Sequence, residues 1–300
     1  MDCGGNIKSF NVNSFNKIVH KTIADDKAEV LQWLSSLEPQ KRHQHLRESR
    51  LEGVDNGFSK QASFGDGIRE KMDRLILCYF AMVIQVWGRL ILGKNNNRGR
   101  NPRSLTTCNF SSLIIDHFYG RQGMTVAGLY CDYLDRKEQT TSNMLGAMLK
   151  QLVGRGNISE DIHKAFEDAK DHFGGVRPQV PELVNMLKTA IGQRQRVIIC
   201  IDGLDESLAA HRTGLLSSLQ AITQELPNVR LFLTGRPFIR GEVEKYFLTV
   251  DTISVSPTEE DTRTFLKVKL AGDPEPDAMG ESLKADIMEV IPQTISEMYV

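Results

Sequence analysis

Three acidic residues and one arginine stand at the ends of two short apolar runs, where their side chains could act on a phosphate group. Asp202, Asp205 and Glu206 follow the apolar run 197–201, and Arg236 follows a second apolar run further along the chain. Apolar runs of this length between turn residues are typical of buried strands in a parallel sheet. The carboxyl ends of such strands form the edge where open α/β sheets bind ligands.

Each of these side chains suits one part of phosphoryl-transfer chemistry. Asp202 can hold a magnesium ion through water, and Asp205 or Glu206 can orient an attacking water. Arg236, at the end of the next strand, can sense the terminal phosphate of a nucleotide. The alternative is a solvated strand-to-helix loop whose carboxylates only cap the helix that follows. The arginine-proline pair that ends the second run favours the nucleotide-type site.

The same segments resemble a known family. The strings RVIICIDGLDES (196–207) and LPNVRLFLTGRP (226–237) are similar to the Walker B and sensor segments of NACHT-type P-loop NTPases. The resemblance is strongest to the fungal receptor-like (NLR-like) proteins with a nephrocystin-like N-terminal module. It extends through residues 126–152 and 254–270, and it includes an approach segment at 41–54.

Such proteins are nucleotide-dependent switches in signal transduction, and the resemblance implies a role for each candidate residue. In an intact relative that binds ATP with magnesium, Asp202 would lie at the metal. Asp205 and Glu206 would be the acidic Walker B residues near the attacking water. Arg236 would couple the phosphate state to a helical lid. Relatives continue beyond the lid into repeats, and we expect that binding or sensing array to be missing here.

The phosphate-binding loop of that family is missing from the sequence. No G-x-x-x-x-G-K-[ST] pattern occurs, and the pair Gly93-Lys94 is followed by Asn95. The backbone N–H groups and the lysine of such a loop supply the main interactions with the phosphates. We therefore expect this chain to bind no nucleotide and to be inactive as an enzyme. The alternative is a non-enzymatic scaffold that uses an α/β domain for protein contacts.

The codons that residues 81–90 permit can also be read in a shifted frame. Allowed codons for AMVIQVWGRL, read two bases later, spell Tyr-Gly-Asp-Pro-Gly-Val-Gly-Lys-Thr, which is a complete phosphate-binding loop. The same frame turns the residues from Leu75 onward into Asp-Leu-Val-Leu-Phe-Cys, a first strand. Allowed codons near Gly93 and Phe110 contain the start and end signals of an intron. Our hypothesis is that residues 55–92 are out-of-frame coding sequence and that 93–110 are a translated intron.

Strand and helix patterns alternate through the rest of the chain. This alternation predicts an α/β fold with a doubly wound, mostly parallel sheet of the P-loop NTPase type. We divide the chain into an N-terminal helical or linker segment (1–54), an aberrant segment that replaces the first strand and the loop (55–110), the NTPase core (111–256) and the truncated start of a helical extension (257–300). The predicted helices are 25–37, 141–152, 159–169, 181–190, 211–225, 241–247 and 282–290, and the predicted strands include 125–133 and 252–255.

The amino-acid composition limits the kinds of partner that we expect this protein to bind. The 37 basic and 38 acidic residues give a net charge of −1, which offers no electrostatic attraction to nucleic acid or to an anionic membrane. Residues 75–92 approach the length of a membrane span, but Gln85 and Arg89 interrupt them. The N-terminus has no apolar signal region and the five cysteines show no C-x-x-C spacing, so we expect a cytoplasmic protein. Protein partners are expected, through self-association of the NTPase module and through an effector.

Overall fold

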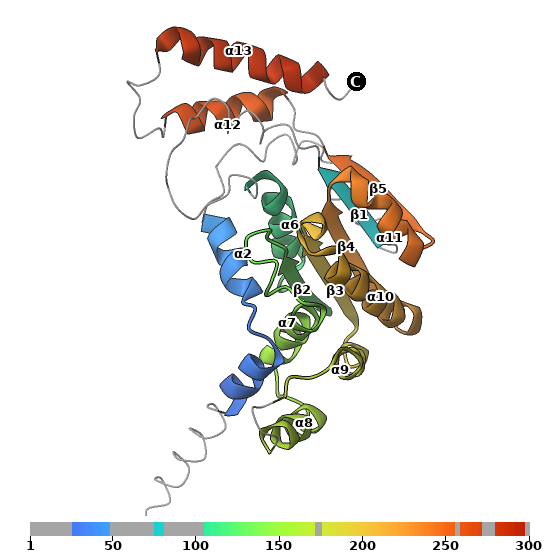
Figure 1. Ribbon diagram of the computed structural model, residues 1–300. Coiled ribbons are helices and arrows are strands. Elements are labelled where there is room, and N and C mark those ends of the chain that lie inside the picture. The colour runs from blue at the N-terminus through green and yellow to red at the C-terminus, as the bar shows by residue number, and fades with distance from the viewer. Residues whose placement is uncertain are drawn as a thin grey trace, which may run out of the picture.

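A single parallel sheet organises the molecule. The computed structural model describes residues 26–48, 75–80, 105–171, 176–255, 259–271 and 280–297. Five strands in these residues pair in the order β2-β3-β4-β1-β5 (Figure 1). They are β1 (Leu75–Phe80), β2 (Met124–Tyr130), β3 (Arg196–Asp202), β4 (Val229–Gly235) and β5 (Val250–Val255). The helices around them are α2 (Pro39–Glu48), α6 (Leu105–Phe118), α7 (Thr141–Gly154), α8 (Glu160–Lys170), α9 (Val180–Gly192), α10 (Ala209–Glu225) and α11 (Arg240–Tyr246).

Both faces of the sheet are covered by helices. In β3, Val197, Ile199 and Ile201 pack with apolar side chains of α7, α9 and α10, whereas Ile198 and Cys200 pack with those of α2 and α6. Neighbouring residues of a strand point to opposite faces, so a strand buried on both faces is apolar along its whole length. The predicted α/β fold with a doubly wound parallel sheet is confirmed.

The alternation of side chains along each strand also determines which face of the sheet each site residue occupies. Asp202 continues the series of Ile198 and Cys200, and Thr234 in β4 continues that of Phe232, which packs in the same cluster. Both polar side chains therefore belong to the face that α6 covers. This placement brings them beside the N-terminal half of α6.

The first strand of the fold is present in the chain, which corrects part of our division into segments. Leu75–Phe80 forms β1 between β4 and β5, with Leu77 aligned to Leu233 on one side and to Thr252 on the other. The prediction that residues 55–110 replace this strand is therefore wrong for these six residues. The run LILCYF contains no glycine or proline and is rich in β-forming residues, so it can pair on both sides.

The remaining part of that segment is described only where α6 begins. Residues 105–110 form the first turns of this helix, although our hypothesis assigns them to an intron. The AMVIQVWGRL stretch and the Gly93-Lys94 pair lie outside the described residues. None of the helices that the structure describes is long and apolar enough to cross a membrane.

The described part of the N-terminal segment packs on the core. Residues 26–34 form a helix within the predicted range 25–37, and its Val30 and Leu34 are buried in the same apolar cluster as α7. The indole N–H of Trp33 donates to the carbonyl of Val176 at 3.0 Å. Of the two roles considered, packing helix and linker, the structure supports packing for these residues.

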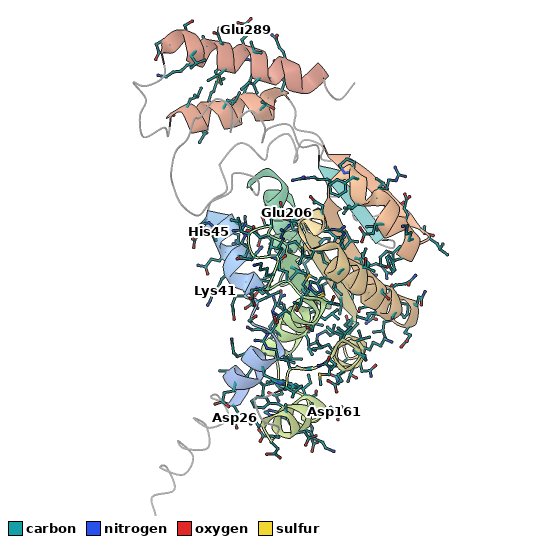
Figure 2. The ribbon with its side chains drawn as sticks, viewed as in Figure 1. Asp26, Lys41, His45, Asp161, Glu206 and Glu289 are labelled. Carbon is teal, nitrogen blue, oxygen red and sulfur yellow. The ribbon has the colours of Figure 1, made fainter. Side chains whose placement is uncertain are left out.

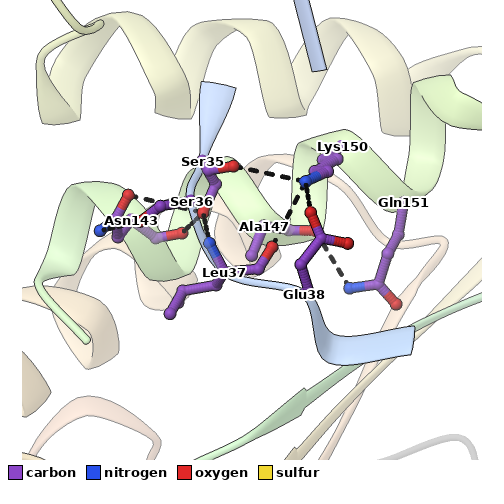
Figure 3. Close-up of polar contacts among 8 residues, drawn as sticks. All are labelled: Ser35, Ser36, Leu37, Glu38, Asn143, Ala147, Lys150 and Gln151. Carbon is purple, nitrogen blue, oxygen red and sulfur yellow. Dashed lines mark hydrogen bonds and ion pairs between the residues drawn. The ribbon is translucent and has the colours of Figure 1, made fainter. Parts of the chain in front are cut away.

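The turn between this helix and α2 is bonded to α7. Ser35 Oγ donates to the carbonyl oxygen of Asn143 at 2.8 Å, and Lys150 Nζ lies 2.6 Å from Glu38 Oε1 (Figure 3). The Nζ of Lys150 also donates to the carbonyl of Ser35 at 3.4 Å. These contacts hold the chain on α7 immediately before α2 begins.

A glycine in α7 permits the close approach of the N-terminal helix. A Cβ at Gly146 would overlap the carbonyl oxygen of Leu34. We expect Gly146→Ala to lower the free energy of unfolding by about 1–3 kcal/mol, because the overlap outweighs the better helix propensity of alanine. Urea unfolding measures this. Gly154→Ala on the same helix is the control, since its Cβ would meet only Leu31 Cδ1, at 3.9 Å. Equal stability of the two variants would contradict the packing described.

Two helices follow the sheet and pack against each other, α12 (Glu259–Ala271) and α13 (Glu281–Glu297) (Figure 1). α13 continues beyond the predicted end at Val290, through Pro292. Proline has no N–H to donate to the carbonyl four residues earlier, which here belongs to Met288. Arg263 of α12 donates its Nη1 to that carbonyl at 2.8 Å. The neighbouring helix thus satisfies the group that the proline leaves without its usual partner.

Candidate functional site

Asp202 is the most buried carboxylate of the predicted site, with 1% of its surface exposed. Its Oδ1 accepts hydrogen bonds from Ser111 Oγ at 2.5 Å and from Thr234 Oγ1 at 2.8 Å. Its Oδ2 is buried and has no hydrogen-bond partner among the residues that the structure describes. Buried polar atoms normally have partners. This oxygen is therefore suited to a cation.

A tight turn places the other two carboxylates beside Asp202. Gly203 adopts a φ of 64°, which glycine reaches without a steric penalty, and a Cβ there would lie 3.3 Å from the carbonyl oxygen of Cys131. The short helix η2 (Leu204–Glu206) follows directly, and the N–H of Glu206 donates to the carbonyl of Gly203 at 2.8 Å. This turn carries Asp205 and Glu206 directly after the end of β3. Figure 2 shows Glu206 at that edge of the sheet.

Asp205 and Arg236 form an ion pair across the ends of β3 and β4. Arg236 Nε lies 3.1 Å from Asp205 Oδ2, and the backbone N–H of Arg236 donates to Oδ1 at 3.2 Å. Burial raises the pKa of Asp205, and the charge of Arg236 partly offsets this rise. Gly235 leaves room for the contact, because a Cβ there would lie 3.3 Å from Asp205 Oδ1. The arginine predicted as a sensor is thus bonded to a predicted Walker B residue.

Glu206 is held by the loop that follows β2. Its Oε2 accepts the backbone N–H of Tyr133 at 3.0 Å. Burial raises the pKa of Glu206 to about 7, the charges of Asp205, Asp132 and Asp202 add to the rise, and the Tyr133 hydrogen bond opposes it. A carboxyl group with a pKa near 7 can exchange a proton with water at neutral pH.

The structure brings all four predicted residues to one edge of the sheet and adds partners that the sequence did not identify. Ser111 and Thr234, both 0% exposed, hold the carboxylate of Asp202. Thr234 Oγ1 also accepts the N–H of Gly203 at 3.0 Å, which ties β4 to the turn. Thr234 could have been identified from the sequence. It lies two residues before Arg236 at the end of a buried strand, and its side chain belongs to the same face of the sheet as that of Asp202. Ser111 could not have been identified in this way.

The donor set fits a magnesium ion only in part. Among the described residues, no group of three or more histidine, cysteine, aspartate or glutamate side chains is placed to hold a metal. Magnesium in nucleotide sites is commonly bound by one or two carboxylates together with phosphate oxygens and water. Asp202 Oδ2 can supply one such ligand. The other ligands would come from phosphate and water.

Comparison with known families places this edge in context. Residues 108–236 match the family described as nephrocystin 3, N-terminal. This segment is nephrocystin-like. The match begins after the missing loop and includes every predicted site residue from Asp202 to Arg236. The nephrocystin-like part of the resemblance inferred from the sequence is confirmed for residues 108–236.

Other comparisons add little to the nephrocystin-like assignment. No curated protein matches the chain. A solved structure described as Drosophila ORC bound to poly(dA/dT) DNA and Cdc6 is similar at 12% identity, with a TM-score of 0.38. The match covers 97% of this chain and 45% of that chain, so this chain spans less than half of its length.

Proposed function

We propose that the nephrocystin-like core belongs to a NACHT-like signalling switch and that its acidic edge binds magnesium-bound ATP in intact relatives. The observation that carries this proposal is the buried carboxylate of Asp202 at the end of β3. Two hydroxyl groups fix one of its oxygens, and the other has no partner in the described residues. A purely structural aspartate would have both oxygens satisfied or exposed to water.

The side chains around Asp202 have the properties that this chemistry requires. A bound magnesium nucleotide would supply the phosphates and the charge on which they act. Asp202 Oδ2 would hold the cation, directly or through water. Glu206, whose pKa lies near 7 because of burial, would accept a proton from the attacking water. The hydrogen bond from the Tyr133 N–H keeps the Glu206 carboxylate oriented.

The ion pair of Arg236 suggests how the phosphate state is sensed. The guanidinium is bonded to Asp205 at 3.1 Å, while 30% of its side chain is exposed. It can therefore exchange the carboxylate for a terminal phosphate without crossing the core. The short helix η3 (Pro237–Ile239) follows immediately and leads into α11. In this proposal, the exchange at Arg236 moves that helical segment.

The chain in its present form should bind no ATP tightly in the presence of magnesium. It lacks the glycine-rich loop and the lysine that contribute most to phosphate binding, and its acidic cluster repels a polyphosphate unless a cation intervenes. Isothermal titration calorimetry should detect no binding in the micromolar range. Micromolar affinity that is lost on Asp202→Ala would contradict this prediction.

Exposed apolar side chains favour a second candidate, a non-enzymatic protein-interaction scaffold. Tyr133 and Leu134 follow β2 and are 45% and 59% exposed, and Phe238 follows β4 and is 67% exposed. These side chains follow strands that end at the same edge of the sheet, where large exposed apolar side chains can contact a protein partner. A scaffold requires no nucleotide, so it predicts that binding stays absent even after the phosphate-binding loop is restored. The switch predicts that binding returns.

A further inference from the structure

The helix α2 rests on the core through few apolar contacts. Pro39 and Leu46 are its buried residues. Beside them a cleft of about 740 Å³ opens between α2, α6, β2 and α7. The polar contacts of α2 therefore add to these two apolar anchors. We propose that α2 is a brace for the acidic edge, with Arg42 and His43 as positioning residues, an inference that rests on the function proposed above.

His43 connects α2 to two elements at once. Its Nδ1 lies 2.6 Å from the hydroxyl oxygen of Tyr130 in β2, and its Nε2 lies 3.0 Å from Asp116 Oδ1 in α6. The side chains of His43 and Asp116 are 19% and 26% exposed, so both contacts are partly shielded from water. Arg47 adds a second cation at 3.5 Å from Asp116 Oδ2.

One partner of His43 lies beside Asp202, and the other belongs to the helix that is bonded to Asp202. Tyr130 is aligned with Asp202 in the pairing of β2 with β3. Asp116 belongs to α6, the helix whose Ser111 holds Asp202 Oδ1. A shift of α2 away from His43's partners would therefore release the strand and the helix that together position the buried carboxylate.

Arg42 connects α2 to the loop after β2. Its Nη2 lies 3.2 Å from Asp132 Oδ2, with 32% and 19% of the two side chains exposed. Asp132 Oδ1 in turn accepts the N–H of Leu134 at 2.9 Å. The residue between them, Tyr133, donates its N–H to Glu206. The ion pair thus holds the loop in the shape that presents this N–H to the carboxylate.

These contacts give α2 a role that an exposed ion pair alone would not have. Surface pairs contribute little to the free energy of unfolding. Here the pairs fix the geometry of the two groups that bond the acidic residues, the Ser111 hydroxyl and the Tyr133 N–H. We therefore expect a movement of α2 to disturb the hydrogen bonds to Asp202 and Glu206 while it changes the free energy of unfolding only a little.

Amide hydrogen exchange on the full chain tests the brace without any nucleotide. In Arg42→Ala, the amide of Tyr133 should exchange about tenfold faster, while the amide of Leu233 in β4 should be unchanged. Arg42→Lys keeps the charge and should retain most of the protection. Lys41→Ala is the matched control, because Lys41 is an exposed cation one residue earlier in α2, and it should change neither amide.

The results that overturn the brace are distinct from those that overturn the proposed function. Equal acceleration of the Tyr133 and Leu233 amides, or no acceleration of either, would refute the brace. In a chain with its phosphate-binding loop restored, Arg42→Ala should weaken magnesium-ATP binding about tenfold relative to Lys41→Ala. Unchanged affinity would also refute the brace. Failure of the restored chain to bind ATP at all would instead refute the function, and the exchange result would stand by itself.

Discussion

A chain whose coding frame is restored over residues 55–92, with residues 93–110 removed, should bind ATP with magnesium, whereas we expect the present chain to bind none. The corrected frame supplies Gly-Asp-Pro-Gly-Val-Gly-Lys-Thr between β1 and α6. The structure already provides the surroundings for this loop, because Ser111 in α6 lies 2.5 Å from Asp202 Oδ1. Backbone N–H groups and the helix N-terminus would then converge on the phosphates opposite Asp202. The affinity should rise at least about a hundredfold.

Calorimetry on three chains measures this effect: the present chain, the restored chain, and the restored chain with its loop lysine changed to alanine. The lysine variant should lose binding and keep its circular dichroism spectrum, since the lysine contributes to phosphate binding and not to the core. Genomic codons that do not spell the loop in the shifted frame would refute the frame hypothesis directly. A scaffold without a phosphate-binding loop would then be the better account of the chain.

Glu206→Gln should stabilise the protein at alkaline pH and leave it unchanged at acidic pH. Burial raises the pKa of Glu206 from 4.5 to about 7. Between these values the folded protein binds a proton that the unfolded chain releases, so the unfolding free energy falls as the pH rises through this window. Glutamine does not ionise, and its amide oxygen can still accept the N–H of Tyr133. The variant should be more stable by about 2 kcal/mol at pH 8, allowing for partial solvation of the carboxyl group.

Urea unfolding at pH 4 and at pH 8 provides the measurement. The quantity of interest is the difference between variant and parent at each pH, because other groups titrate in both proteins. Glu244→Gln serves as the control, since Glu244 forms an exposed pair with Arg240 on α11 and should show no comparable dependence on pH. A difference between Glu206→Gln and the parent that is the same at both pH values would contradict the burial of this carboxyl group.

The division of the chain into segments shows where sequence reasoning succeeded and where it did not. The strand 196–202 and the helices after it were predictable, because their apolar runs and turn residues are local signals. The missing loop led us to discard Leu75–Phe80 with its neighbours, yet these residues pair with β4 and β5. Pairing depends on the apolar character of the strand and on a gap between two other strands. A shifted reading of the same codons, Asp-Leu-Val-Leu-Phe-Cys, meets that requirement as well.

The amino-acid sequence was sufficient to predict that Asp202, Asp205, Glu206 and Arg236 share one edge of the sheet. Parallel strands end on the same side, and each of these residues closely follows a buried strand. The hydrogen bonds, ion pair and pKa values of these side chains depend instead on the tertiary fold. Asp202 is bonded by hydroxyl groups 91 and 32 positions away, Arg236 is paired with Asp205, and burial sets the pKa of Glu206. Hydrogen bonding and desolvation depend on distance in space, and local sequence patterns carry no record of partners so far apart in the chain.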